Sequence, residues 1–298
     1  MKIAISIALL MGLISFVDLH DVWLKLQHAD IAYVAAAILC LLMAYCLCGL
    51  RWAWMAEGLG MQINRWRKQQ LLFLGLFVSL FMPTTIGGDF VRGLLMGRGR
   101  KEQKWSAYAS VFLDRLNGFF ALILLLIACL YFVEIPRQWL LFSLAIAFFI
   151  WLTLAIYPWI HKRLPDKFSK WRDLPLNSKA FVGSWWQCLL MSMLILVLVI
   201  QTHVFLGMAV GMNLSWQAYG VMVTLVALAS VLPISFNGFG IREAGYVGIA
   251  TYFAAETSNA AAMAGLWAIL IYICALPGYI ALIKIGGFGV LRKRSRSD

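Results

Sequence analysis

The dominant pattern along the chain is a series of long apolar stretches separated by short polar or basic segments. A helix needs about 20 consecutive apolar residues to cross about 30 Å of membrane hydrocarbon. Stretches close to this length predict six full membrane spans, of which the first is short. They lie at about 3–19, 31–54, 107–132, 139–160, 186–210 and 259–283. The sequence therefore predicts an all-α, polytopic helical membrane protein with one transmembrane domain over residues 1–298.

Two further apolar segments do not fit this spanning pattern. Leu71 to Met82 has about 12 residues, or roughly 18 Å as a helix, which is too short to cross alone. Trp216 to Leu232 is the other segment, and each is followed by a proline, several glycines and a second apolar piece. Each unit is either a re-entrant hairpin or a pair of full spans. The distribution of charges does not separate these alternatives, because both return the chain to the side of the membrane from which it entered.

The two units resemble each other over residues 60–96 and 211–255. The first contains VSLFMPTTIGGDFVRG at 78–93, and the second contains ASVLPISFNGFGIREAG at 229–245. In both, the fifth residue after the proline is glycine (Gly88, Gly238) and the ninth is arginine (Arg92, Arg242). Upstream, the sequence GMQI from residue 60 matches GMNL from residue 211. Because the copies start on opposite sides of the predicted membrane, they indicate an inverted repeat with broken helices.

Broken helices of this kind often build binding sites near the bilayer midplane in transporters. Proline and glycine free backbone groups, which must face protein or a polar cavity rather than lipid. The start of each second half-helix presents N–H donors and a positive dipole end, and Arg92 or Arg242 adds a charge one turn later. Each unit is thus predicted to form a phosphate-binding corner. The alternative is that the prolines and glycines only kink packed helices and that Arg92 extends to the membrane interface.

A second set of candidate residues is charged and lies inside a predicted span. Asp114 and Arg115 are adjacent, so they do not share a helix face and each needs a partner elsewhere. Asp114 is expected to pair with Arg92 or Arg242, and Arg115 with Asp89 or Glu243. The alternative is a structural ion pair near the interface. The complete set of candidate substrate-binding residues is Asp89, Arg92, Asp114, Arg115, Arg242, Glu243, Asn237, Gly87, Gly88 and Gly238.

Composition supports a membrane protein, and the distribution of charge predicts its orientation. Hydrophobic residues make up 63% of the 298 residues and charged residues 13%, whereas soluble domains carry about 25% charge. The net charge of +12 does not indicate nucleic-acid binding, because the basic residues gather on one predicted side. By the positive-inside rule, both termini and the basic tail, 285–298, are expected in the cytoplasm and the protein in the cytoplasmic (inner) membrane. The basic residues between spans two and three are Arg51, Arg65, Arg67, Lys68, Arg98, Arg100, Lys101 and Lys104.

The sequence offers few groups for catalysis. The six cysteines and four histidines have no metal-binding spacing, and no nucleotide-binding or hydrolase motif is present. We therefore expect no metal, no cofactor and no enzymatic activity.

Three motifs together resemble a known family. They are P-x-x-x-G-G-D-x-x-R at 83–92, L-D-R-x-x-G at 113–118 and N-G-x-G-x-R-E at 237–243. Their order and spacing are similar to those of the lysylphosphatidylglycerol synthase transmembrane region, a flippase-like family, over nearly the whole chain. The resemblance implies a lipid flippase-type domain, and it maps the family's charged positions onto Asp89, Arg92, Asp114, Arg115, Arg242 and Glu243. The aminoacyl-transferase domain of fused family members does not occur in this sequence, so synthase activity is not carried over.

The leading hypothesis is translocation of a phosphate-headgroup lipid, either a phospholipid or a polyprenyl-phosphate-linked lipid. The expected partners are therefore anionic or phosphate-bearing membrane lipids. A second hypothesis is a membrane-embedded glycosyl or phosphoryl transferase with Asp89, Asp114 or Glu243 as a base. A third is an accessory protein that binds an envelope-synthesis enzyme.

Overall fold

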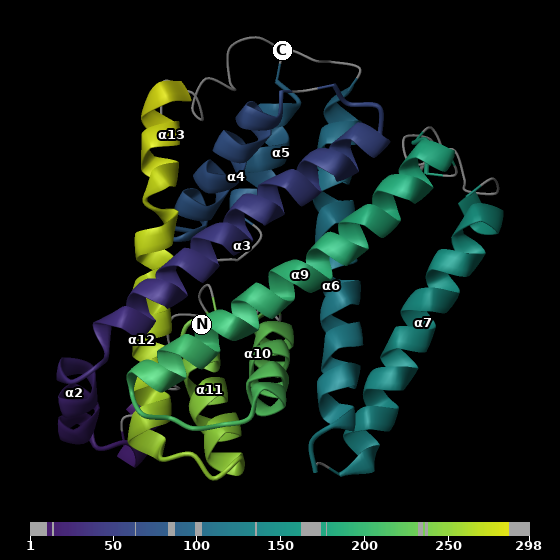
Figure 1. The fold of residues 1–298 in the computed structure, drawn as a ribbon. Coiled ribbons are helices and arrows are strands. Elements are labelled where there is room, and N and C mark those ends of the chain that lie inside the picture. The colour runs from purple at the N-terminus through teal and green to yellow at the C-terminus, as the bar shows by residue number, and fades with distance from the viewer. Residues whose placement is uncertain are drawn as a thin grey trace.

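The computed structural model describes residues 11–13, 15–62, 64–82, 87–98, 103–134, 136–161, 174–176, 178–231, 235 and 238–285. Every regular element in these ranges is a helix, as the sequence predicts (Figure 1). The helices are α2 (Leu19–Gln27), α3 (Ile31–Gly58), α4 (Arg65–Ser79), α5 (Gly87–Met96), α6 (Lys104–Tyr131), α7 (Arg137–His161), α9 (Lys179–Ala209), α10 (Trp216–Val231), α11 (Ile241–Tyr252), α12 (Thr257–Ala275) and α13 (Pro277–Ile285).

Within the part of the chain that the structure describes, four segments are long and apolar enough to cross a membrane. They are Ile31–Gly58, Lys104–Tyr131, Lys179–Ala209 and Thr257–Lys284, and each overlaps one of the predicted spans over most of its length. The last consists of α12 and α13, which are separated by a break at Leu276 before Pro277. The predicted span 139–160 corresponds to the 25-residue helix α7. The chain is therefore an all-α polytopic membrane protein.

The predicted first span, 3–19, is described only in part, because residues 3–10 and 14 lie outside the described ranges. The side chain of Asp18 accepts hydrogen bonds from the backbone at the start of a separate helix, α2. With nine residues, α2 is about 14 Å long and too short to cross hydrocarbon. At the other end of the chain, only Ile285 of the predicted basic tail 285–298 is described.

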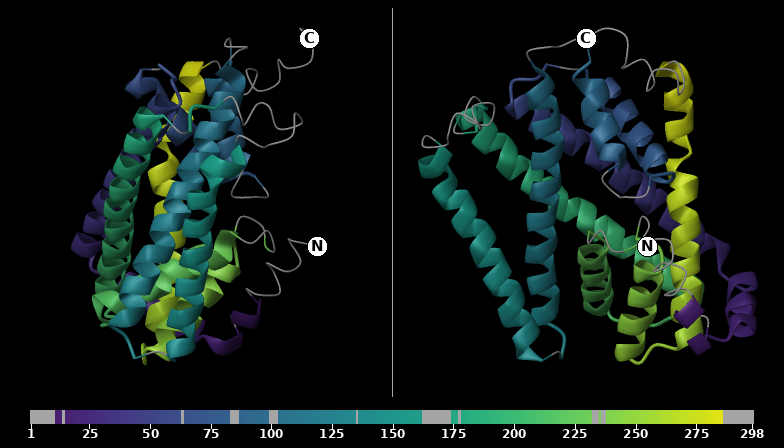
Figure 2. Two further views of the ribbon diagram at one scale, coloured as in Figure 1. Left: turned by 90° about the vertical axis from the view of Figure 1, so that its right-hand side faces the viewer. Right: turned by 180° about the vertical axis from the view of Figure 1, so that it is seen from behind.

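The two segments that did not fit the spanning pattern each form a pair of short helices. The lengths are 15 and 10 residues for α4 and α5, and 16 and 12 residues for α10 and α11. The corresponding helices are about 15–24 Å long, which is less than the thickness of the hydrocarbon core. The α4–α5 pair lies toward one end of the molecule and the α10–α11 pair toward the other (Figures 1 and 2).

The helices α3 and α9 run diagonally across one face of the molecule and make the most extensive helix–helix contact in the described chain (Figures 1 and 2). Each ends in the same way, before its short pair begins. Gly60 and Gly211 both have φ of +77°, a conformation that favours glycine. The next N–H, from Met61 or Met212, bonds back to a carbonyl five residues earlier, at 3.0 and 2.8 Å. These matched ends agree with a duplicated unit, while the inverted repeat itself stays a prediction.

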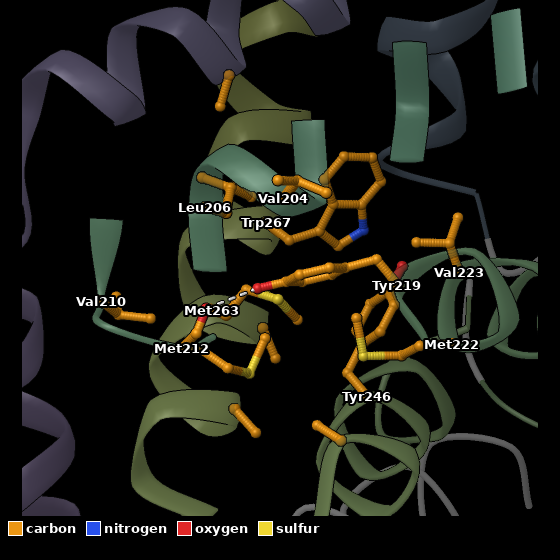
Figure 3. Close-up of a cluster of buried hydrophobic side chains, with 14 of the residues drawn as sticks. Val204, Leu206, Val210, Met212, Tyr219, Met222, Val223, Tyr246, Met263 and Trp267 are labelled. Atoms are coloured by element: carbon orange, nitrogen blue, oxygen red, sulfur yellow. Dashed lines mark hydrogen bonds between the residues drawn. The ribbon is translucent and has the colours of Figure 1, made fainter. Parts of the chain in front are cut away.

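Each short pair has its own hydrophobic core. The core around α4 and α5 contains Trp52, Leu74 and Leu95 and extends to α6 and α13. The core around α10 and α11 joins α3, α9 and α12, and Figure 3 shows Tyr219 inside it, near Met212 and Trp267. The Tyr219 hydroxyl donates to the carbonyl of Met212 at 2.9 Å, so its polar group is satisfied inside the core (Figure 3).

Candidate functional site

A cluster of charged side chains lies where α3, α5 and α6 meet. Asp114 on α6 is 2% exposed and accepts two hydrogen bonds from Arg51 on α3, at 2.8 and 3.1 Å. The Nη2 atom of Arg92, on α5, lies 3.6 Å from Asp114 and 3.3 Å from Asp89. Arg115 Nε donates to the other oxygen of Asp89 at 2.5 Å. The five residues Arg51, Asp89, Arg92, Asp114 and Arg115 are called the ion cluster below.

A fourth helix supports the ion cluster through uncharged groups. Arg51 Nη1 donates to the hydroxyl of Ser192 on α9 at 2.9 Å. Ser192 is also 2.9 Å from the side-chain oxygen of Asn117, whose amide donates to the carbonyl of Trp185 at 3.0 Å. Arg51 therefore has partners on both α6 and α9, which fixes its guanidinium as a bidentate donor to the Asp114 carboxylate.

The guanidinium group of Arg92 packs against an aromatic ring. Its Cζ atom lies 4.5 Å from the ring centre of Trp52, a distance suited to a cation–π interaction. Trp52 is itself fixed by a hydrogen bond from its Nε1 to Ser110, at 3.1 Å. Arg92 is 4% exposed, and its Nε and Nη2 atoms are buried without a hydrogen-bond acceptor among the described residues. The side chain thus retains unused donors despite two nearby carboxylates.

The charges of the ion cluster do not balance. Three guanidinium groups face two carboxylates, which leaves one positive charge in excess when all five groups are ionised. Unused donors together with excess positive charge make this a site suited to an anionic group.

The pairings differ in part from those expected from the sequence. Arg92 pairs with Asp114 and Arg115 with Asp89, which are two of the predicted alternatives. The main partner of Asp114 is Arg51, which sequence analysis wrongly counted with the basic loop. Arg51 is 9% exposed and lies inside α3, which continues to Gly58, beyond the predicted end of the span at 54. The position of Arg51 inside the predicted span 31–54 was the signal that its side chain is buried.

Arg242 has a different environment from Arg92. Of the two arginines predicted as partners of Asp114, Arg92 is the one that lies beside it, and among the described residues no ion pair joins Arg242 to a carboxylate. The reason lies in Glu243, which accepts a hydrogen bond from the backbone N–H of Gly240 at 2.7 Å and thereby caps the start of α11. Arg242 Nε is buried without a hydrogen-bond partner, and its Cζ lies 5.2 Å from the Phe239 ring centre.

A hydrogen bond links α11 to α9. The Nδ1 atom of His203 lies 2.8 Å from the carbonyl oxygen of Val199, and its Nε2 lies 2.9 Å from the hydroxyl of Tyr246 on α11. Because a carbonyl oxygen only accepts, Nδ1 carries the proton and Tyr246 donates to Nε2. The Trp267 ring packs against the imidazole at 4.2 Å. Tyr246 follows Arg242 by one helical turn, so this bond also positions the arginine.

The helix α3 contacts Arg92 through Trp52, whose ring centre lies 4.5 Å from the Arg92 Cζ atom. Neither of two cavities formed by described residues includes Arg92 or Arg242 in its lining. A shared cavity between the two arginines stays a prediction.

The predicted glycines serve mainly the geometry of the short helix pairs. At Gly88, an added Cβ would collide with the carbonyl oxygen of Gly75 and with Ser79 Oγ, so this glycine permits the close approach of α5 to α4. Gly87 is similarly close to Met82. Gly238 has φ of +81° just before α11. Asn237, the remaining predicted site residue, lies outside the described residues.

Comparison with known proteins gives a family and one curated relative. Residues 1–278 match the family described as the lysylphosphatidylglycerol synthase TM region. The chain is 24% identical over 181 residues to a UPF0104 membrane protein of Methanothermobacter thermautotrophicus, a match that covers 57% of this chain and 52% of the relative. The chain therefore spans about half the length of the curated relative. The family is consistent with a role related to membrane lipids. On a match that covers nearly its whole length, this multi-pass membrane protein belongs to the lysylphosphatidylglycerol synthase transmembrane region family.

Proposed function

We propose that this protein translocates a phosphate-headgroup lipid, a phospholipid or a polyprenyl-phosphate-linked lipid, across the cytoplasmic membrane. The observation that carries the proposal is Arg92, which is 4% exposed and lies in a cluster with one excess positive charge. Its buried Nε and Nη2 atoms make no hydrogen bond, although Nη2 lies at ion-pair distance from two carboxylates. A phosphate oxygen at this position would accept from those donors and neutralise the excess charge. Such compensation is needed because a bare anion is very costly inside the hydrocarbon.

Arg242 is the second binding site for the headgroup in this proposal. Its Nε lacks an acceptor, and the preceding loop contains the buried hydroxyl of Ser235, which also lacks one among the described residues. The two arginines belong to helix pairs toward opposite ends of the molecule (Figure 1). A headgroup that moves from one arginine to the other would advance through the membrane interior with a donor at each stage.

The direction and energy source are also part of the proposal. We place the end of the molecule that carries Arg65, Arg98 and Lys179 in the cytoplasm, together with both termini, following the positive-inside rule. With this orientation α4–α5 and α10–α11 are re-entrant hairpins that enter from opposite faces as an inverted repeat. An anionic lipid that moves outward across 100 mV, inside negative, gains about 2.3 kcal/mol per charge. The proposed activity is transport without a chemical reaction or a resident cofactor, and an envelope-synthesis enzyme is its candidate partner.

The test is lipid translocation by the purified full-length chain in vesicles. A fluorescent phosphatidylglycerol placed in both leaflets is bleached from outside with an impermeant reductant, and the loss of the protected fraction gives the transbilayer rate. We expect a faster rate than in empty vesicles, a lower rate for Arg92→Lys and a still lower rate for Arg92→Ala. Lysine keeps the charge but not the planar set of donors. A polyprenyl-phosphate probe is measured in parallel.

The matched control is Arg65→Lys, which makes the same substitution in an arginine whose side chain is 62% exposed at the start of α4. It should leave the rate unchanged. If neither phosphate-bearing probe moves faster with protein than without it, the proposed function is wrong. If Arg92→Lys and Arg65→Lys give the same rate as the unaltered chain, transport does not use the ion cluster.

A further inference from the structure

An apolar cavity of about 360 Å³ lies between α6, α7, α10 and α11. Its lining is almost wholly aliphatic and aromatic, and includes Leu126 from α6, Phe142 from α7, Leu225 from α10 and Ile249 from α11. The hydroxyl of Ser143, a polar member of the lining, donates to the carbonyl of Trp139 at 2.9 Å and is thus already satisfied. Apolar cavities of this kind do not hold water, because water finds no hydrogen-bonding partners there.

In a membrane protein, hydrocarbon is the material available to fill such a space. At about 30 Å³ for each group of the size of a water molecule or a methylene, the cavity has room for roughly a dozen groups. This corresponds to a large part of one lipid chain. Moving a methylene from the surrounding lipid into the cavity stabilises the bound state only slightly, because both environments are apolar. A lipid whose chain fills the cavity therefore needs a second contact with the protein to bind in preference to other membrane lipids.

The helix α11 connects the cavity to such a point. Arg242 lies in the first turn of α11, and Gly248, which lines the cavity, follows six residues later. Six residues correspond to about 9 Å of helix. A Cβ added at Gly248 would meet no heavy atom within 4 Å, so the backbone of α11 is open at this residue, which lines this cavity and also a second one beside Leu13 and Thr257. Along α11, a charged donor is thus followed by an apolar cavity. A lipid has the same order, with a phosphate followed by a hydrocarbon chain.

We propose that this cavity binds one hydrocarbon chain of the lipid whose phosphate contacts Arg242. The inference rests on the proposed function, because it assumes the phosphate-headgroup substrate. It adds that the protein holds the substrate by its chain as well as its headgroup. In the proposed orientation this chain site lies on the side away from the basic cytoplasmic end, where the lipid arrives after outward movement.

The experiment is photo-crosslinking in vesicles that contain the full-length chain. The probe is a phosphatidylglycerol with a diazirine near the middle of one acyl chain, and a diacylglycerol with the same chain serves as the phosphate-free comparison. After irradiation, mass spectrometry maps the labelled peptides. We expect the phosphatidylglycerol probe to label lining residues of α6, α7, α10 or α11 at least about tenfold more than the diacylglycerol probe, a difference of about 1.4 kcal/mol in binding.

Two variants test the connection. Gly248→Leu fills the open space and should reduce cavity labelling several-fold, and Arg242→Gln should reduce it to the level of the diacylglycerol probe. Gly265→Leu is the matched control, because an added Cβ at this glycine in α12 also meets no atom within 4 Å and Gly265 lies outside the cavity lining. It should label like the unaltered chain, and helical circular dichroism checks that each variant is folded.

Equal labelling by both probes, unaffected by Arg242→Gln, would show that bulk lipid fills the cavity and would overturn the inference. Rapid translocation with no labelling in the cavity would also overturn it while leaving the proposed function intact. Conversely, labelling that depends on Arg242 without translocation would support the chain site and contradict the transport proposal.

Discussion

Replacing Asp114 by asparagine should destabilise the protein strongly, because this carboxylate faces two buried arginines. The substitution keeps the shape of the side chain but leaves three guanidinium groups facing the single carboxylate of Asp89. Removing one partner of a buried ion pair costs about 3–5 kcal/mol. Since asparagine retains one acceptor oxygen for the two donors of Arg51, we expect a loss near 3 kcal/mol.

A double-mutant cycle separates this interaction from general damage to the core. Arg51→Gln removes the two hydrogen bonds to Asp114 and the one to Ser192, and should also cost about 3 kcal/mol. The double variant removes one charge of each sign and restores the original net charge of the cluster. We therefore expect a total loss of about 3–4 kcal/mol rather than 6, which is a coupling energy of about 2–3 kcal/mol.

The measurement is reversible unfolding of the purified protein in mixed micelles of mild detergent and dodecyl sulfate, followed by helical circular dichroism. A second cycle with Lys25→Gln and Glu256→Gln provides the control, because this pair is exposed and its coupling should be much smaller. If the losses for Arg51 and Asp114 add to within about 0.5 kcal/mol, these two residues do not stabilise each other and the description of the ion cluster is wrong.

Two further predictions concern the attachment of α11 and α2. Tyr246→Phe removes the donor to a buried imidazole nitrogen of His203 and should cost about 1–3 kcal/mol of stability in the same unfolding assay. Tyr252→Phe, with an exposed ring on the same helix, should leave the stability unchanged. Equal losses of stability in the two variants would contradict the assigned hydrogen bond. The hydroxyl of Ser258 and then the ammonium of Lys25 lower the pKa of Glu256 below its ordinary value. The contact of Glu256 with α2 should therefore be fully present above the ordinary pKa of the carboxyl group and lost as the pH falls through its lowered pKa. Hydrogen exchange in α2, corrected for intrinsic rates, should rise below about pH 4.5. Glu256→Gln should remove this pH dependence, and an unchanged dependence in that variant would refute the assignment.

The long helices were predictable because hydropathy over about 20 residues records what lipid requires of a spanning segment. The two interrupted segments were also visible, since Pro83 follows a run too short to cross and Pro233 follows the other run, but the sequence left open whether they form re-entrant hairpins or full spans. Their bounds, such as α5 at Gly87–Met96, needed the structure, because the proline and glycine positions mark a break without fixing where the next helix begins.

The partners of the charged residues were harder to predict. Pairing depends on the rotation of each helix about its axis, which the sequence of a single chain does not specify. Arg51 was counted with the basic loop that follows the second span, although the predicted span 31–54 already contained it. Glu243 was one of two predicted partners of Arg115, but its position three residues after Gly240 suits a cap of its own helix.

The partners of Arg51 also constrain how the chain is made. Asp114 lies 63 residues after Arg51, and Ser192 lies 141 residues after it. At a synthesis rate of about 5–20 residues per second, Asp114 emerges roughly 3–13 s after Arg51, and Ser192 roughly 7–28 s after it. During this interval α3 carries an arginine without its carboxylate, and such a residue is costly in hydrocarbon. The nascent α3 must therefore keep Arg51 at the membrane surface or inside the insertion machinery until α6 arrives.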